Sequence, residues 1–160
     1  MELKEIIIEK LNGSFENAVL SVSEFRGDLS INVPGSKITA ICKFLKEDTG
    51  LSFDVCRDIT AIDWARRKNR FTIVYHLYSL KNKFCLRLKV DIEEESIESV
   101  TSVWHSANWY ERETFDMYGI KFINHPDLRR VYMPEEFEYY PLRKEFPLLG
   151  IPGSLTLPKK

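Results

Sequence analysis

Three acidic side chains, Glu111, Glu113 and Asp116, lie close together in a segment with helical periodicity. Carboxylates grouped in this way can hold a divalent cation or share general acid and base roles. On a helical wheel at about 100° per residue, however, the three side chains point in different directions. Their spacing therefore disfavours both a metal site and a paired acid–base site.

The other residue types that commonly carry chemistry form no recognisable site either. His76 alternates with Tyr75 in a predicted strand, His105 lies on the polar side of the predicted helix, and His125 precedes Pro126. None of them stands in register with a serine or cysteine nucleophile or with a cluster of metal ligands. The glycines are dispersed and make no phosphate-binding loop. We therefore expect no catalytic, cofactor-binding or metal-binding residues in this chain.

Glu111 differs from its acidic neighbours because it falls inside the apolar arc of the predicted helix, between Trp104 and Tyr118. Arg112 and Asp116 lie opposite and, being four residues apart, can pair on that polar face. A buried carboxylate without a partner costs several kcal/mol, so Glu111 needs a cation or several hydrogen-bond donors. Two alternatives stay open: an arginine of the same chain supplies the charge, or another protein completes this face of the helix.

The composition describes a globular chain of 160 residues, with 44% hydrophobic residues and almost balanced charge, 23 Lys+Arg against 24 Asp+Glu. Balanced charge speaks against a dedicated nucleic-acid binder. Cys42, Cys56 and Cys85 form no CxxC motif, which fits a reducing compartment. The N-terminal apolar run is too short for a signal peptide, and no stretch is long enough to cross a bilayer. Any membrane association is therefore expected to run through a partner.

Hydrophobic periodicity and turn residues predict helices and strands in an α+β order. The expected elements are a helix from Leu3 that Gly13 ends, strands 18–25 and 29–33 joined by a turn at 26–28, a helix at 37–47, strands 53–62, 71–78 and 84–90, and a helix at 97–118. We predict a small antiparallel or mixed sheet with helices on one side. The basic run 66–70 and the acidic run 93–95 are interpreted as a solvated loop and a solvated helix start.

Six of the seven prolines lie in the last part of the chain, where no helical or strand period survives. Proline disfavours regular structure, yet aromatic and basic side chains are abundant here, as they are in protein interfaces. We therefore divide the chain into an α+β domain, residues 1–119, and an extended C-terminal arm, residues 120–160. The arm is predicted to lie along a surface, either of a partner subunit or of its own domain.

The segment that joins domain and arm carries an ordered series of motifs: Glu111-Arg112-Glu113, Asp116-Met117-Tyr118-Gly119, His125-Pro126, Leu128-Arg129-Arg130 and Pro141-Leu142-Arg143-Lys144. This series resembles the C subunit, or 30-kilodalton subunit, of NADH:quinone oxidoreductase, respiratory complex I. The preceding region is similar to that family in length and pattern, so the resemblance covers nearly the whole chain. The stretch Phe137-Glu138-Tyr139-Tyr140 departs from the Trp, Gly and polar residue that are common in the family.

The resemblance implies a non-catalytic assembly subunit in the hydrophilic arm of the complex, packed against the D (49-kilodalton) subunit and the cluster-bearing B subunit. The FMN, iron–sulfur clusters, NADH and quinone would be bound by other subunits. The chain would sit at the cytoplasmic face of the inner (plasma) membrane, or in the equivalent organelle compartment. Implied interface or structural residues are Glu111, Arg112, Glu113, Asp116, His125, Arg129, Arg130, Pro141, Leu142, Arg143 and Lys144.

Two alternatives remain at this point. The same signature occurs in membrane-bound hydrogenases and in ferredoxin-linked complexes, and nothing in the chain identifies the electron donor. A free-standing α+β module that binds RNA or protein is the other alternative, with the basic run 66–70 and the aromatic sheet as its binding surface. The balanced charge argues against the RNA-binding form.

Overall fold

The computed structural model describes residues 2–150, which form three α-helices, seven strands and one short 3-10 helix. In chain order they are α1 (Leu3–Ser14), β1 (Ser21–Phe25), β2 (Asp28–Asn32), the 3-10 helix η1 (Gly35–Lys37), α2 (Ile38–Glu47), β3 (Val55–Asp63), β4 (Phe71–Ser79), β5 (Phe84–Ile92), β6 (Ser96–Glu98), α3 (Ala107–Tyr118) and β7 (Lys121–Ile123). The predicted α+β class is confirmed, and most boundaries differ by a few residues, with the helix predicted at 97–118 as the exception.

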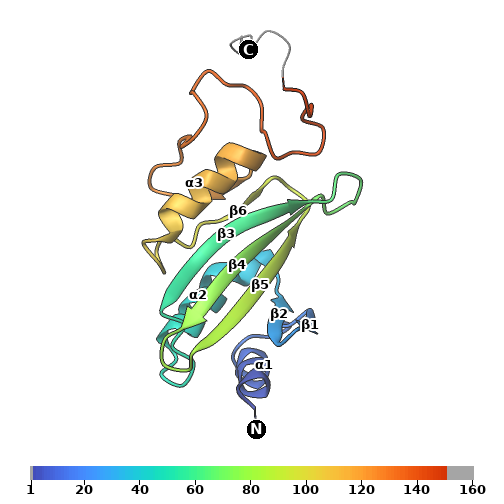
Figure 1. Ribbon diagram of the computed structural model, residues 1–160. Coiled ribbons are helices and arrows are strands. Elements are labelled where there is room, and N and C mark those ends of the chain that lie inside the picture. The colour runs from blue at the N-terminus through green and yellow to red at the C-terminus, as the bar shows by residue number, and fades with distance from the viewer. Residues whose placement is uncertain (1, 151–160) are drawn as a thin grey trace.

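Five strands form a mixed sheet in the order β1-β2-β5-β4-β3. All neighbours pair antiparallel except β2 and β5, which are parallel. The β1–β2 hairpin turns at Arg26 and Gly27, both with positive φ, the backbone that a two-residue hairpin turn needs. Helix α2 lies behind the sheet in Figure 1, and α1 lies at the N-terminal end of the molecule. Buried side chains of both helices join those of the sheet in one core.

Strand β5 shows how the sequence assigns the two faces of the sheet. Leu86, Leu88 and Val90 are buried in the core, whereas the alternating residues Arg87 and Lys89 lie on the opposite, half-exposed face. In α2, apolar residues at helical spacing bury one side of that helix in the same core. Period-two and period-3.6 patterns therefore predict this core correctly.

The prediction of one long helix at 97–118 is wrong. Ser96–Glu98 forms β6, which pairs in parallel with β7, and the chain turns through Val100 and Trp104 before α3 begins at Ala107. The apolar residues of 97–104 are buried as predicted, but in a strand and turns rather than in a helix. The partner that makes β6 a strand lies more than twenty residues further along the chain, beyond the reach of local periodicity.

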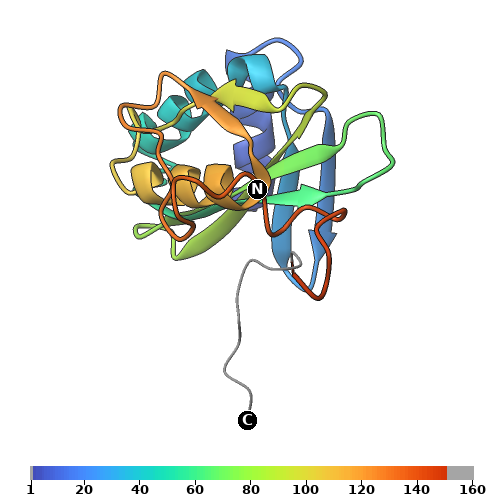
Figure 2. The same cartoon turned by 90° about the horizontal axis from the view of Figure 1, so that it is seen from above.

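The arm lies past α3, at the end of the molecule opposite the N-terminal helix (Figure 1). Its first residues are part of the folded core, because Ile120 and Phe122 are buried and β7 completes the small parallel pair. Residues 124–150 contain no helix or strand. Figure 2 shows the molecule from the end where the arm lies, and there residues 124–150 cross from α3 towards the loop between β3 and β4.

Adjacent residues of β5 give a direct test of the two faces. We expect Leu88→Ala to lower the free energy of unfolding by about 2–5 kcal/mol, because it leaves a cavity in the core. Lys89→Ala, on the other face, is expected to change it by less than about 0.5 kcal/mol. Urea unfolding of both variants measures the difference, and equal losses would contradict the assignment of faces.

Candidate functional site

The arm is fixed to α3 by the carboxylate of Asp116, which is fully buried. Its Oδ2 accepts the backbone N–H groups of Val131, Tyr132 and Met133 at 3.0, 2.7 and 3.0 Å, and its Oδ1 accepts the Arg130 guanidinium at 2.6 Å. Burial by itself raises the pKa of this carboxyl, but the four hydrogen bonds outweigh burial and hold the pKa below its ordinary value. Asp116 therefore stays charged and fixes the path of the arm.

Arg112 binds the same stretch of the arm through its carbonyl groups. Its Nε and Nη2 donate to the backbone oxygens of Arg129 and Arg130 at 3.1 and 3.3 Å, and its guanidinium lies 5.2 Å from the centre of the Trp109 ring. The predicted pair between Arg112 and Asp116 is wrong. Asp116 faces the arm rather than solvent, and the arm's own Arg130 is its partner.

A second contact joins the arm to the end of α3. The Arg143 Nε donates to the backbone oxygen of Tyr118 at 2.5 Å, and its Nη2 donates to Glu95 Oε2 at 2.6 Å. The backbone N–H of Leu142 donates to the Met117 oxygen at 3.1 Å. Two of the last carbonyls of the helix, which have no partner inside a helix, are thus satisfied by the arm.

Gly119 makes this close approach possible. It ends α3 with φ +78°, and its N–H donates to the Phe115 oxygen at 2.8 Å, the usual left-handed helix end. A Cβ at this position would lie 2.6 Å from both Arg143 Nη2 and the Tyr140 ring. Any side chain here would therefore collide with the arm as well as strain the backbone.

A third contact, which the sequence analysis missed, lies at the end of β3. Asp63 accepts hydrogen bonds from Arg70 Nε and Nη2 at 3.0 and 2.8 Å, from the N–H of Ala65 at 2.8 Å, and from the N–H of Lys144 in the arm at 2.9 Å. The Arg70 guanidinium holds the pKa of this carboxyl well below its usual range. Arg70 also pairs with Glu145, so it is not the solvated loop residue that we predicted.

Glu111 is fully buried beneath α3 and is satisfied within its own chain. Its Oε2 accepts the Ser99 hydroxyl at 2.6 Å and its Oε1 accepts the Val100 N–H at 2.7 Å. The alternative in which one of the chain's arginines supplies a charge is wrong, because the two donors are neutral. Burial raises the pKa of Glu111 to about 7, and the two hydrogen bonds offset only part of that rise.

His125 lies beside this carboxylate and links the start of the arm to α3. Its Nδ1 accepts the Asp127 N–H at 3.0 Å, so the neutral ring carries its proton on Nε2, which lies 3.1 Å from the Asn108 oxygen and 4.0 Å from Glu111 Oε2. Burial lowers the pKa of this imidazole. A neutral His125 therefore acts as a hydrogen-bond donor at this junction.

The remaining predicted residues take smaller parts. Arg129 is exposed and pairs with Asp127, and Lys144 contributes its backbone rather than its side chain. Glu113 and Pro141 are half-buried, whereas Leu142 is exposed.

Several residues that hold the arm lie outside the predicted set: Asp63, Arg70, Glu95 and Glu145. Glu145 directly follows the last motif residue, Lys144, whereas Asp63, Arg70 and Glu95 precede the motif by many residues, and only their polar side chains could have indicated these contacts.

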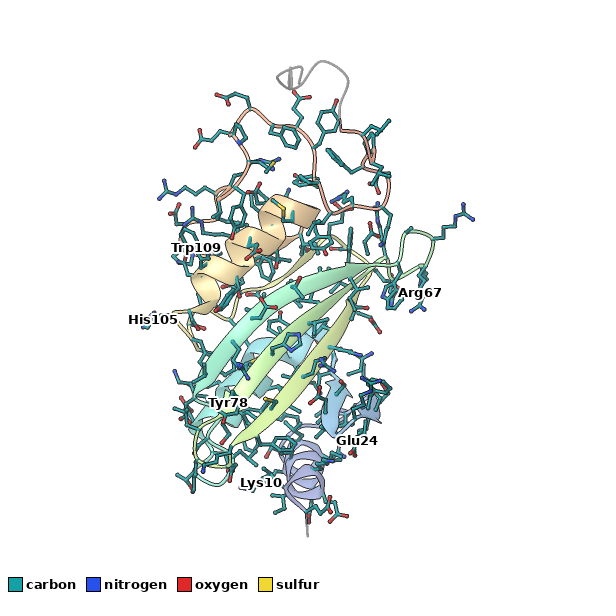
Figure 3. The ribbon with its side chains drawn as sticks, in the orientation of Figure 1. Lys10, Glu24, Arg67, Tyr78, His105 and Trp109 are labelled. Carbon is teal, nitrogen blue, oxygen red and sulfur yellow. The ribbon has the colours of Figure 1, made fainter. Side chains whose placement is uncertain are left out.

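Two of the side chains labelled in Figure 3 point away from the contacts between the arm and the domain. Trp109 points outward from α3, and Arg67 stands at the tip of the β3–β4 loop (Figure 3).

The chemistry of residues 2–150 is that of fixing a segment in place. No three His, Cys, Asp or Glu side chains in this range are grouped closely enough to hold a metal ion. None of the helices described is long and apolar enough to span a membrane. What the arrangement does contain is carboxylates that bind backbone N–H groups and arginines that bind backbone oxygens.

Replacement of Asp116 tests whether it fixes the arm. In Asp116→Asn the charge that faces Arg130 and three N–H groups is lost, and we expect amide hydrogen exchange at Val131–Met133 to accelerate by roughly ten- to a hundredfold, equivalent to about 1.5–3 kcal/mol. The control is Asp127→Asn, an exposed carboxylate of the same segment. Unchanged exchange in Asp116→Asn would show that the arm is ordered by other contacts.

The raised pKa of Glu111 predicts a pH dependence of stability. Between the ordinary value near 4.5 and the folded value of about 7, the folded state binds the proton more tightly than the unfolded state, so stability falls as pH rises through this window. Glu111→Gln removes that fall. We expect the variant to gain up to roughly 3 kcal/mol relative to the native chain between about pH 4.5 and 7.5.

Urea unfolding of both proteins at the two pH values measures this difference. His125, whose lowered pKa acts in the opposite direction, is present in both proteins and lies 4.0 Å from Glu111, so the difference between the two pH profiles reports Glu111 together with its coupling to His125. Glu113→Gln serves as the control on the same helix. Parallel pH profiles for the native chain and Glu111→Gln would mean that Glu111 does not titrate in this window.

Comparison with known proteins gives one consistent answer. Residues 31–151 match the family described as the respiratory-chain NADH dehydrogenase 30 Kd subunit. The C subunit of NADH-quinone oxidoreductase from Geobacter sulfurreducens is 46% identical over 144 residues, covering 88% of each chain. A C-type subunit of the same enzyme from Rhizobium meliloti is 49% identical over 145 residues, covering 90% of this chain and 80% of the relative.

Two solved structures share the fold. Nqo5, in a trypsin-resistant fragment (1–134), superposes with a TM-score of 0.64 at 26% identity, covering 78% of this chain and 98% of the fragment. A chain of the membrane-bound sulfane sulfur reductase, an archaeal respiratory membrane complex, superposes with a TM-score of 0.76 at 25% identity, covering 92% of this chain and 88% of that chain. With a family match that spans most of the residues and relatives at nearly half identity, the chain belongs to the 30-kilodalton subunit family of respiratory-chain NADH dehydrogenase.

Proposed function

We propose that the chain is a non-catalytic assembly subunit in the hydrophilic arm of a proton-translocating NADH:quinone oxidoreductase. One observation carries this proposal: the inner side of the C-terminal arm is hydrogen-bonded to its own domain, while the outer side exposes apolar groups. Leu148 and Leu149 are 101% and 99% exposed, and Tyr132, Tyr139 and Leu142 are about half exposed. A fixed segment that presents aromatic and aliphatic side chains is the usual form of a protein interface.

The proposed partners are the D (49-kilodalton) subunit, along which the arm runs, and the cluster-bearing B subunit. Family membership supports this assignment, as does the position of the arm at one end of the molecule, where a large neighbour can cover it without disturbing the sheet (Figure 1). In this proposal FMN, iron–sulfur clusters, NADH and quinone are bound by other subunits, and the chain's own role is to hold those subunits in place.

The proposal places the chain at the cytoplasmic face of the inner (plasma) membrane, or in the equivalent organelle compartment, as a peripheral subunit. A related membrane-bound complex with another electron donor is the second candidate, because the sulfane sulfur reductase chain has the same fold over most of this sequence. The free-standing RNA-binding module has no comparable support, since the curated relatives are subunits of an oxidoreductase.

The exposed leucines test the interface. We expect the double variant Leu148→Ser, Leu149→Ser to recover at least about tenfold less partner protein, because two fully exposed leucines lose burial worth about 1.5–3 kcal/mol each. The measurement is affinity purification of the tagged full-length chain from gently solubilised membranes, with mass spectrometry of the recovered subunits. A large D-type subunit among them would also support the proposed partner.

The matched control is Leu80→Ser, an exposed leucine in the β4–β5 hairpin, far from the arm. It is expected to leave recovery unchanged. Equal recovery by the double variant, the control and the native chain would contradict an interface on the arm. Recovery of RNA in place of protein subunits would contradict the assembly role itself.

A further inference from the structure

Residues 138–146 of the arm form a hollow of about 380 Å³, lined by Glu138, Tyr139, Tyr140, Arg143, Glu145 and Phe146. It lies on the segment that follows the Asp116 contact and includes the residues next to Lys144, whose N–H is held by Asp63. The walls of the hollow are therefore fixed to the domain at both ends. The hollow is separate from the Asp116 contact and from the exposed leucines, so neither of them assigns it a binding role.

Aromatic rings form much of its wall. Tyr139 and Phe146 stand 6.5 Å apart between ring centres with planes at 67°, and Phe137 supports both at 5.7 and 6.3 Å. The face of an aromatic ring carries negative charge density and attracts ammonium and guanidinium groups. Tyr140 already receives a guanidinium in this way, since Arg143 lies 4.7 Å from its ring centre.

The charges around the hollow are predominantly negative. Glu138 and Glu145 line it directly, and the three arginines at the hollow already have partners. Arg143 contacts Glu95, Glu145 and the Tyr118 oxygen, and Arg70 pairs with Asp63 and Glu145. Arg130, which lies 5.2 Å from the centre of the Tyr140 ring, pairs with Asp116. Five carboxylates thus face three guanidiniums, an excess of two negative charges, and the exposed Lys144 ammonium leaves an excess of one. Within residues 2–150, Glu138 takes part in no ion pair.

We propose that this hollow receives a basic side chain, lysine or arginine, from the partner subunit on which the arm docks. The inference rests on the proposed function and adds the chemistry of the contact. A cation fits both features of the site, because the rings attract it and Glu138 neutralises it. An apolar side chain would bury Glu138 without a partner, and an acidic one would be repelled.

Paired substitutions of the full-length chain distinguish a cation from simple apolar burial. Tyr139→Leu keeps an apolar side chain but removes the ring face, whereas Tyr139→Phe keeps the ring. Glu138→Gln removes the charge and Glu138→Lys reverses it. Glu135→Gln, an exposed carboxylate outside the lining of the hollow, is the control. The readout is recovery of partner subunits by the tagged chain from gently solubilised membranes at low and high salt.

We expect Tyr139→Leu and Glu138→Gln each to lower recovery by about three- to tenfold, and Glu138→Lys to lower it further. Tyr139→Phe and Glu135→Gln should match the native chain. The effect of Glu138→Gln should shrink at high salt, because salt screens the native ion pair. A carbodiimide, which joins carboxylates to lysines without a spacer, should link Glu138 to a lysine of the partner if the side chain is an ammonium.

Unchanged recovery in Tyr139→Leu and Glu138→Lys, while the native chain still assembles, would overturn this inference and leave the proposed function intact. A native chain that recovers no subunit of an oxidoreductase would overturn both. Normal hydrogen exchange at Val131–Met133 in every variant confirms that the arm keeps its place, so that a loss of recovery reports the contact rather than local unfolding.

Discussion

The carboxylate of Asp116 holds three consecutive backbone N–H groups and one guanidinium, and the path of the irregular segment after β7 depends on it first. Buried backbone groups must find partners, and the arm, which has no helix or strand, supplies only scattered turn hydrogen bonds to itself. Asp116 supplies three at once from a position that the helix makes rigid. Without this carboxylate the stretch Val131–Met133 would lose the acceptor that sets its path over the surface, although the contacts of Arg143 and Lys144 further along the arm would remain.

The other contacts follow the same rule in complementary form. Carboxylates at the ends of α3 and β3 accept the arm's N–H groups, while Arg112 and Arg143 donate to carbonyls of the arm and of the helix end. Charged side chains of the regular elements therefore bind the arm's backbone, and Arg143 of the arm binds the backbone of the helix end in return. Glu111 does not take part in these contacts with the arm. It accepts hydrogen bonds from Ser99 and Val100 and so stabilises the turn between β6 and α3.

The sequence predicts those parts of the molecule that depend on near neighbours. Alternation in β5 and helical spacing in α2 identify the core correctly, because each residue's face follows from its own element. Local periodicity assigns β6 to the start of a helix because its partner β7 lies beyond the helix α3. It gives no sign of Asp63 for the same reason: the Lys144 N–H that Asp63 binds is 81 residues away. The helical wheel places Asp116 on the solvent face, whereas the structure buries it against the arm.

The attachment of the arm to its own domain bears on how fast and how durably the chain joins a larger assembly. A free tail of this length would lose its conformational freedom only at the moment of contact, and that loss would weaken the complex. Here intramolecular hydrogen bonds order residues 130–145 of the arm during folding, so in the proposed interface this conformational entropy is already lost before the neighbour binds. Such preorganisation favours slow dissociation, the property that a permanently assembled electron-transfer machine requires of its scaffold.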